Sequence, residues 1–174
     1  MRLFLAVEFD DGVKEKLSQR IQELKQCALR GRFTRTENLH LTLIFLGETE
    51  RVESIREVVD RTKGEPFSFT ISGTGRFRRP GGDIYWAGVS SCPPLESLYR
   101  QLADGLRRAG FTVEQRPFRP HVTLARETVL QGELPEREDI SCQVFGVSLM
   151  KSERIQGKLV YSCIYFKKFH TNEK

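Results

Sequence analysis

Hydrophobic positions along the chain follow two spacings, one typical of helices and one typical of strands. Apolar residues recur every three or four positions in three segments, which predicts amphipathic helices over residues 11–29, 51–62 and 93–110. Dense or alternating aliphatic and aromatic residues predict strands over residues 2–9, 39–47, 67–73, 84–89 and 121–126. Two more strands are expected over residues 140–154 and 158–169, antiparallel around the turn at 154–158. Such mixed strands and helices indicate an α+β protein.

The same order of elements occurs twice. Residues 2–47 run strand, helix, a loop with Arg and Phe, and a strand that opens with His-x-Thr; residues 84–126 repeat that order. The two phrases begin at His40 ("HLTLIFLG") and His121 ("HVTLAR"), 81 positions apart, and use two of only three histidines. No linker separates the halves. We therefore expect one domain over residues 1–174, built as two pseudo-symmetric lobes, each an antiparallel-rich sheet with outer helices, flanking a central groove.

Composition limits the class of protein. With 39% hydrophobic and 29% charged residues, the chain can bury a core and remain soluble, and no apolar run approaches the roughly 20 residues that span a bilayer. The start, "MRLFLAVEFD", lacks the long apolar region of a secretory signal, so a cytoplasmic protein is expected. We also expect a monomer. The four cysteines are scattered without metal-ligand or disulfide spacing, which favours free thiols and no metal or cofactor.

Positive charge gathers in three short clusters. The net charge is +5, and arginines concentrate in "RGRFTR" (30–35), "RFRR" (76–79) and "RPFR" (116–119). Two of these clusters directly precede the His-Thr phrases, which favours a basic rim that attracts phosphate over an ordinary solvated face. Four arginines are candidates for phosphate contacts along a bound polyanion: Arg35, Arg78, Arg79 and Arg119.

Each His-x-Thr phrase places an imidazole and a hydroxyl on one face of its strand. Side chains two apart point the same way, so His40 lies beside Thr42 and His121 beside Thr123. If the lobes face each other, one histidine can accept a proton while the other donates one, and the hydroxyls can hold phosphate oxygens. This set suits metal-independent attack on a phosphodiester. A partly buried structural histidine is the ordinary alternative for either phrase alone, but the duplication favours catalysis.

Two more side chains occupy equivalent places. Phe45 lies five residues after His40 and Arg126 five after His121, so symmetry predicts an aromatic ring and a guanidinium on opposite walls at the groove's edge. Such a pair can sandwich a nucleobase. Strict alternation along a strand argues against this, because an odd offset points away from the histidine unless the strand ends or twists first. Gly47 is compatible with a strand end after Phe45. Tyr85 and Trp86 are expected to divide between core and surface, and His170 to lie on the surface.

These phrases and their surroundings resemble a known family. "RLFLAVEF", "NLHLTLIFLG", "IYWAGV" and "RPFRPHVTLAR" are similar to segments of the two-histidine phosphoesterases, specifically the RNA 2′,3′-cyclic phosphodiesterases once named 2′-5′ RNA ligases. The resemblance implies that His40 donates a proton to the 3′ leaving oxygen and that His121 activates water, while Thr42 and Thr123 hold the phosphate. It also implies an RNA substrate with a 2′,3′-cyclic phosphate end, such as a tRNA fragment, and a 2′-phosphate product.

Two other functions stay open from the sequence. A relative could act on a small cyclic nucleotide or an ADP-ribose cyclic phosphate. A binding module could keep the groove without the chemistry, although retention of both histidines and both threonines disfavours this. The reverse reaction, joining of 2′-5′ RNA ends, is chemically allowed.

Overall fold

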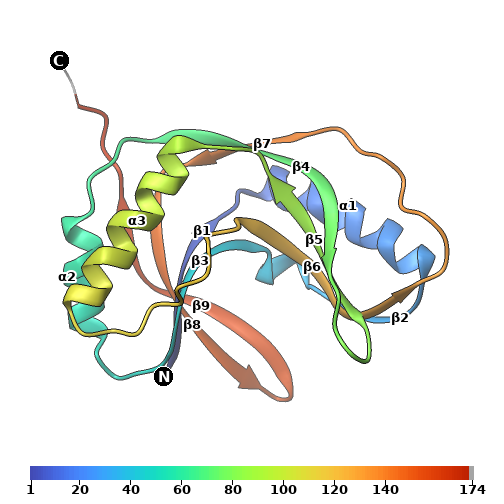
Figure 1. The fold of residues 1–174 in the computed structure, drawn as a ribbon, viewed down its shortest axis with the longest axis horizontal. Helices are drawn as coiled ribbons and strands as arrows, with labels where there is room; N and C mark the ends of the chain where they lie inside the picture. The colour runs from blue at the N-terminus through green and yellow to red at the C-terminus, as the bar shows by residue number, and fades with distance from the viewer. Residues whose placement is uncertain (173–174) are drawn as a thin grey trace.

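The computed structural model describes residues 1–172 and arranges them as two sheets with helices on their outer sides (Figure 1). Residues 173–174, the end of the expected single domain, lie outside the described part. The helices are α1 (Asp11–Cys27), α2 (Val52–Arg61) and α3 (Pro93–Arg108), with a short 3-10 helix η1 (Thr36–Asn38). The strands are β1 (Arg2–Glu8), β2 (Ala28–Phe33), β3 (His40–Glu48), β4 (Phe67–Phe77), β5 (Asp83–Val89), β6 (His121–Leu130), β7 (Ile140–Val144), β8 (Gly146–Ile155) and β9 (Lys158–Lys168).

Two antiparallel sheets form the two lobes. One has the strand order β3-β1-β8-β9 and the other β2-β6-β5-β4-β7, and every strand pair among residues 1–172 is antiparallel. The helices exchange sides: α1 follows β1 but packs on β2, β6 and β7, whereas α3 follows β5 but packs on β3 and α2. The expected α+β fold with two lobes is confirmed, and each half of the chain supplies the helix that covers the other half's sheet.

The helices form where the sequence pattern predicts them. At the start of α1, the Asp10 carboxylate accepts a hydrogen bond from the Val13 backbone N–H over 2.8 Å, which is a side-chain N-cap. Two prolines open α3, where their missing N–H groups cost nothing. Gly110 follows with a φ of +85°, a left-handed backbone that favours glycine and ends the helix. Within residues 1–172, no helix combines the length and the apolar character needed to cross a membrane.

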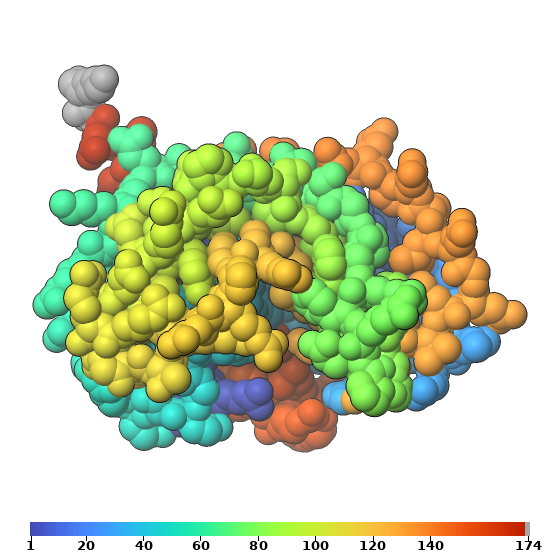
Figure 2. Space-filling view, in the orientation of Figure 1, coloured from blue at the N-terminus to red at the C-terminus, as the bar shows by residue number. Residues whose placement is uncertain are grey.

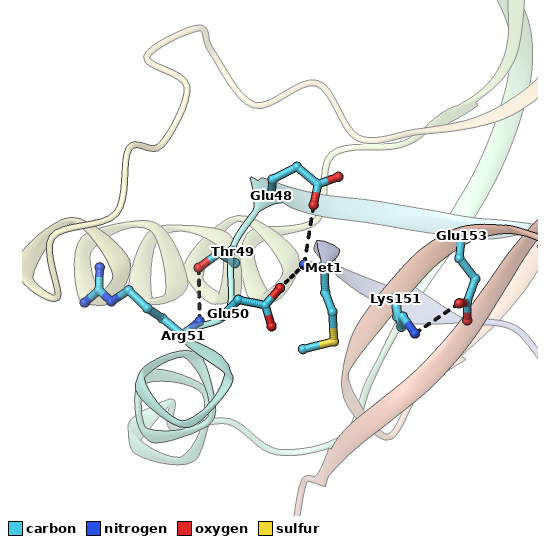
Figure 3. Close-up of polar contacts among 7 residues, drawn as sticks. All are labelled: Met1, Glu48, Thr49, Glu50, Arg51, Lys151 and Glu153. Carbon is cyan, nitrogen blue, oxygen red and sulfur yellow. Dashed lines mark hydrogen bonds and ion pairs between the residues drawn. The ribbon is translucent and has the colours of Figure 1, made fainter.

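Strand β1 lies between β3 and β8 in the four-stranded sheet, and its side chains are buried on both faces. Leu3, Leu5 and Val7 join a contiguous core drawn from both sheets. Phe4 and Ala6 point the other way and pack with Met150 of β8. The start of β1 is fastened to the end of β3, because the Met1 ammonium lies 2.5 Å from Glu50 and 3.4 Å from Glu48 (Figure 3). Strand β3 is thereby held along its length.

Three segments differ from the expectation. Residues 28–33, expected as the end of the first helix and the start of a loop, form β2, which pairs with β6 at the edge of the five-stranded sheet. The residues between the strands expected over 67–73 and 84–89 favoured a loop or an open hairpin tip; they form a hairpin, in which β4 continues through Phe77 and only residues 78–82 turn. The single strand expected over 140–154 is two strands: β7 pairs with β4, and β8 pairs with β1. Between them the chain crosses from one sheet to the other at Gly146, where a Cβ would stand 2.1 Å from the Lys167 carbonyl oxygen.

Candidate active site

A cavity of about 790 Å³ lies where β3 and β6 contact each other. His40 and Thr42 at the start of β3 line it, together with His121 and Thr123 at the start of β6. The space-filling view is hollowed in this region, where the yellow segment before β6 meets the green β4–β5 hairpin (Figure 2). The structure thus brings together the four side chains of the duplicated phrases.

Both imidazoles are held in the same way from behind. Nδ1 of His40 lies 2.7 Å from the Asn38 carbonyl oxygen, and Nδ1 of His121 lies 2.7 Å from the Arg119 carbonyl oxygen. Because a carbonyl oxygen only accepts, each Nδ1 carries the hydrogen, and the neutral ring keeps its lone pair on Nε2. Nε2 of His40 lies 2.8 Å from the hydroxyl of Thr42. Each neutral ring therefore has a defined tautomer, with Nε2 as the nitrogen that can accept a proton.

Aromatic side chains fix the ring of His40. Tyr161 of β9 meets it edge-on, with ring centroids 5.1 Å apart and an interplanar angle of 89°. Phe4 of β1 lies against it at 5.0 Å. Tyr161 also lines the cavity, and burial raises the pKa of its hydroxyl, so that group stays a neutral hydrogen-bond donor at neutral pH.

The ring of His121 has an equivalent aromatic enclosure. Phe77 of β4 meets it edge-on at 5.2 Å and 87°, and Trp86 of β5 lies at 6.1 Å. Space for the indole is made by Gly75, where a Cβ would stand 2.2 Å from the Trp86 ring. Trp86, expected to serve only core or surface, thus helps to hold His121.

Burial lowers the pKa of His40. Desolvation lowers its pKa below the ordinary 6.5; a hydrogen bond to Asn38 and the charge of Glu8 partly oppose this, while the charges of Arg126 and Lys14 add to it. Arg126 comes from the opposite sheet, so its field reaches across the cavity. His40 in the free protein consequently favours the neutral form more than an exposed histidine does.

Phe45 and Arg126 reach the cavity because both strands carry the same bulge. Leu5 of β1 pairs with Ile44 of β3, but the next residue, Ala6, pairs with Thr42. One residue of β3 between Ile44 and Thr42 therefore has no partner in β1. In the other sheet, two consecutive residues of β5 pair with Ala125 and Thr123 of β6, which leaves one residue of β6 unpaired between them. The extra residue reverses the alternation, so the odd offset turns inward again. The expected strand end at Gly47 is wrong, since β3 continues to Glu48.

As predicted by symmetry, Phe45 and Arg126 both line the cavity, from β3 and β6 respectively. Phe45 is 60% exposed, which is unusual for a phenylalanine and leaves its ring free for a planar ligand.

The four predicted arginines have different environments. Arg79 and Arg119 line the cavity. Arg35 also lines it, but Glu37 pairs with its guanidinium at 3.0 Å and the Leu159 carbonyl accepts from it at 2.6 Å. Much of its capacity to bind a phosphate is therefore used within the protein. Arg78 lies outside the cavity, at the turn of the β4–β5 hairpin, so its expected contact with a phosphate along a bound RNA stays a prediction.

Sequence reasoning missed three residues that shape the site: Asn38, Phe77 and Tyr161. Asn38 contributes its backbone carbonyl to His40, a role that no residue type signals. Phe77 was assigned to a loop, and Tyr161 lies far along the chain, on a strand whose place in the sheet the sequence does not reveal.

The donor atoms gathered at the cavity are imidazole nitrogens, hydroxyls and guanidinium groups. Among residues 1–172, no three His, Cys, Asp or Glu side chains are placed to hold a metal ion. His170 is exposed at the far end of the chain, as expected.

Comparison with known proteins agrees with this site. A sequence model of the 2′-5′ RNA ligase superfamily matches residues 13–155. The RNA 2′,3′-cyclic phosphodiesterase of Thermotoga maritima is 36% identical over 72% of this chain and 70% of its own length. That of Archaeoglobus fulgidus is 32% identical over 92% of both chains. The crystal structure of E. coli LigT complexed with 3′-AMP superposes with a TM-score of 0.86 at 27% identity, covering 98% of each chain.

Two lobes facing each other with paired His-x-Thr phrases are the arrangement of a two-histidine phosphoesterase. Within that class, the chain belongs to the 2′-5′ RNA ligase superfamily, which confirms the resemblance drawn from its sequence.

Proposed function

We propose that the protein is a metal-independent RNA 2′,3′-cyclic phosphodiesterase that leaves a 2′-phosphate. The observation that carries this is the pair of imidazoles at one cavity, each with its Nδ1 hydrogen-bonded to a carbonyl, which leaves the lone pair of the neutral ring on Nε2 to accept a proton. Membership of the superfamily and the names of the relatives support the activity. Together they favour a cyclic phosphodiester as substrate.

In the proposed reaction, water attacks the phosphorus of the cyclic phosphate while Nε2 of His121 accepts a proton from it. The bond from phosphorus to the 3′ oxygen breaks as the Nε2–H of protonated His40 donates to that oxygen. The Thr42 and Thr123 hydroxyls donate to the non-bridging oxygens, whose negative charge increases in the transition state. The products are a 3′ hydroxyl and a 2′-phosphate. If a 5′-hydroxyl of RNA replaced water as the nucleophile, the same groups would form a 2′-5′ phosphodiester and release the 3′ hydroxyl.

The nucleoside next to the phosphate would be held by stacking. Phe45 and Arg126 line the cavity from opposite strands, and a base between them gains aromatic stacking and cation–π contact without base-specific hydrogen bonds. E. coli LigT, which has been crystallised with 3′-AMP, is a structural relative consistent with a nucleotide there. We also propose that the enzyme acts as a cytoplasmic monomer of one domain, on RNA ends such as those of tRNA fragments.

The proposal is tested with an oligonucleotide that carries a 2′,3′-cyclic phosphate, incubated with the protein in EDTA. Mass analysis combined with enzymatic end-mapping should identify a 2′-phosphate. His40→Ala and His121→Ala should each reduce kcat/KM by about 100-fold or more, whereas Thr42→Ala and Thr123→Ala should cost less, because water can replace one hydroxyl.

His170→Ala is the matched control, since that histidine is exposed and far from the cavity. It should keep full activity, and circular dichroism should show every variant folded. Binding without turnover would instead indicate an RNA-binding module. Turnover confined to a free cyclic nucleotide or an ADP-ribose cyclic phosphate would indicate a small-molecule enzyme.

A further inference from the structure

We propose that the β8–β9 hairpin forms a second phosphate subsite, which binds the internal phosphodiester that precedes the terminal nucleotide of an RNA substrate. This inference rests on the proposed function and extends it from the reacting end to the strand behind it. It would make the enzyme prefer an oligonucleotide over a free cyclic nucleotide.

The hairpin is attached directly to the segment that holds His40. The carbonyl oxygen of Leu159, near the hairpin turn, accepts hydrogen bonds from Asn38 at 2.9 Å and from Arg35 at 2.6 Å. Asn38 is buried, and its own carbonyl accepts from Nδ1 of His40. Two successive hydrogen bonds thus connect the hairpin to the imidazole, so a group bound at the hairpin has a defined position relative to the reacting phosphate.

The pairing register of β8 with β9 places Arg154 on the face of the hairpin that borders the cavity. Arg154 pairs with Leu159, and Ser152 with Tyr161, so these four side chains share one face of the hairpin. Tyr161 on that face contacts His40. Arg154 and Lys158 both line the cavity. The shared face therefore runs from the imidazole to Arg154, while Lys158, which pairs with Ile155, lines the cavity from the hairpin turn.

The charges at the hairpin turn are not neutralised by carboxylates within the described part of the chain. Among residues 1–172, Arg154 donates only to the Gly157 carbonyl, at 3.3 Å, and no carboxylate lies within 4 Å of Arg154 or Lys158. Lys151, further along β8, is by contrast paired with Glu153 at 3.0 Å (Figure 3). Free cations beside a cavity are the groups that bind phosphate oxygens without reading sequence.

The hairpin and the proposed base-stacking pair lie on different sides of His40. Phe45 lies further along β3, beyond Thr42, whereas the hairpin is bonded to Asn38, before β3 begins. A nucleotide with its base at Phe45 and its cyclic phosphate at the imidazoles therefore leaves the hairpin for the preceding linkage.

The test compares two substrates that differ by one nucleotide: adenosine 2′,3′-cyclic phosphate and the dinucleotide ApA with the same cyclic end. The wild type should show a kcat/KM about tenfold higher for the dinucleotide, the gain expected of one charge-assisted contact. The double variant Arg154→Gln/Lys158→Gln should reduce this ratio to near one. Lys168→Gln, at the other end of β9, is the control and should keep the wild-type ratio.

A dinucleotide with a neutral methylphosphonate linkage should behave like the mononucleotide with the wild type, because the charge that the hairpin binds is absent. A double variant that keeps the wild-type ratio, or an equal loss on both substrates, would overturn the subsite. Failure of the wild type to hydrolyse either substrate would instead reject the proposed function, so the two failures are distinguishable.

Discussion

The burial of His40 opposes its proposed role as a proton donor. Burial lowers its pKa below 6.5, which favours the neutral ring, whereas a proton donor must be charged. If His40 is the acid, kcat/KM falls as pH rises through the lowered pKa of His40, because the protonated form is lost. The alkaline limb of the pH profile should therefore lie below pH 6.5, and kcat/KM is the quantity to measure since it reports the free enzyme.

An NMR titration of the His40 ring in the free protein supplies the matching pKa independently. His40 would be the base instead if activity fell as pH decreased through that same pKa, and the two proton-transfer roles would then be exchanged. Orientation alone does not decide between them, since both rings present Nε2 to the cavity. The difference between the histidines lies in their surroundings: a tyrosine beside one and a tryptophan beside the other.

Gly75 of strand β4 leaves room for the Trp86 ring, which in turn contacts His121. In Gly75→Ala, the new Cβ would stand 2.2 Å from the Trp86 ring, so the indole must shift against the imidazole it contacts. Overpacking of this kind costs about 1–3 kcal/mol, and kcat/KM should fall with it. Trp86 is the only tryptophan of the chain, so its fluorescence reports the displacement directly.

Thr74→Ala in the same strand is the control for this substitution, because Thr74 is exposed and, one position before Gly75, points to the other face of the strand. It should leave both fluorescence and activity unchanged. Unaltered Trp86 emission with full activity in Gly75→Ala would show that the indole does not position His121.

At the level of strands, the sequence predicts where elements form better than how they pair. Alternation correctly placed His40 beside Thr42, but it could not show the bulge at Leu43, because the extra residue exists only relative to the neighbouring strand. Symmetry between the halves placed Phe45 correctly where local alternation did not. The β7–β8 break was missed for a similar reason: Gly146 marks a close approach to Lys167, a contact distant in sequence.

The two lobes depend on each other for their cores. Helix α1 is contributed by the N-terminal half yet covers the five-stranded sheet, and α3 comes from the second half yet packs on β3 of the other sheet. Residues of both sheets belong to one contiguous core. Removing either half would expose the apolar face of both sheets, which makes the catalytic groove a product of the whole chain rather than of a lobe.

This exchange of helices predicts that the protein unfolds in a single step. In urea, fluorescence of Trp86 reports the five-stranded sheet, while far-ultraviolet circular dichroism reports all helices and strands. The two transitions should coincide, because opening one lobe removes a helix from the other. A midpoint for Trp86 well below that of the dichroism would mean that the lobes unfold independently. In that case His121 would lose its position while His40 kept its own, and activity would follow the fluorescence.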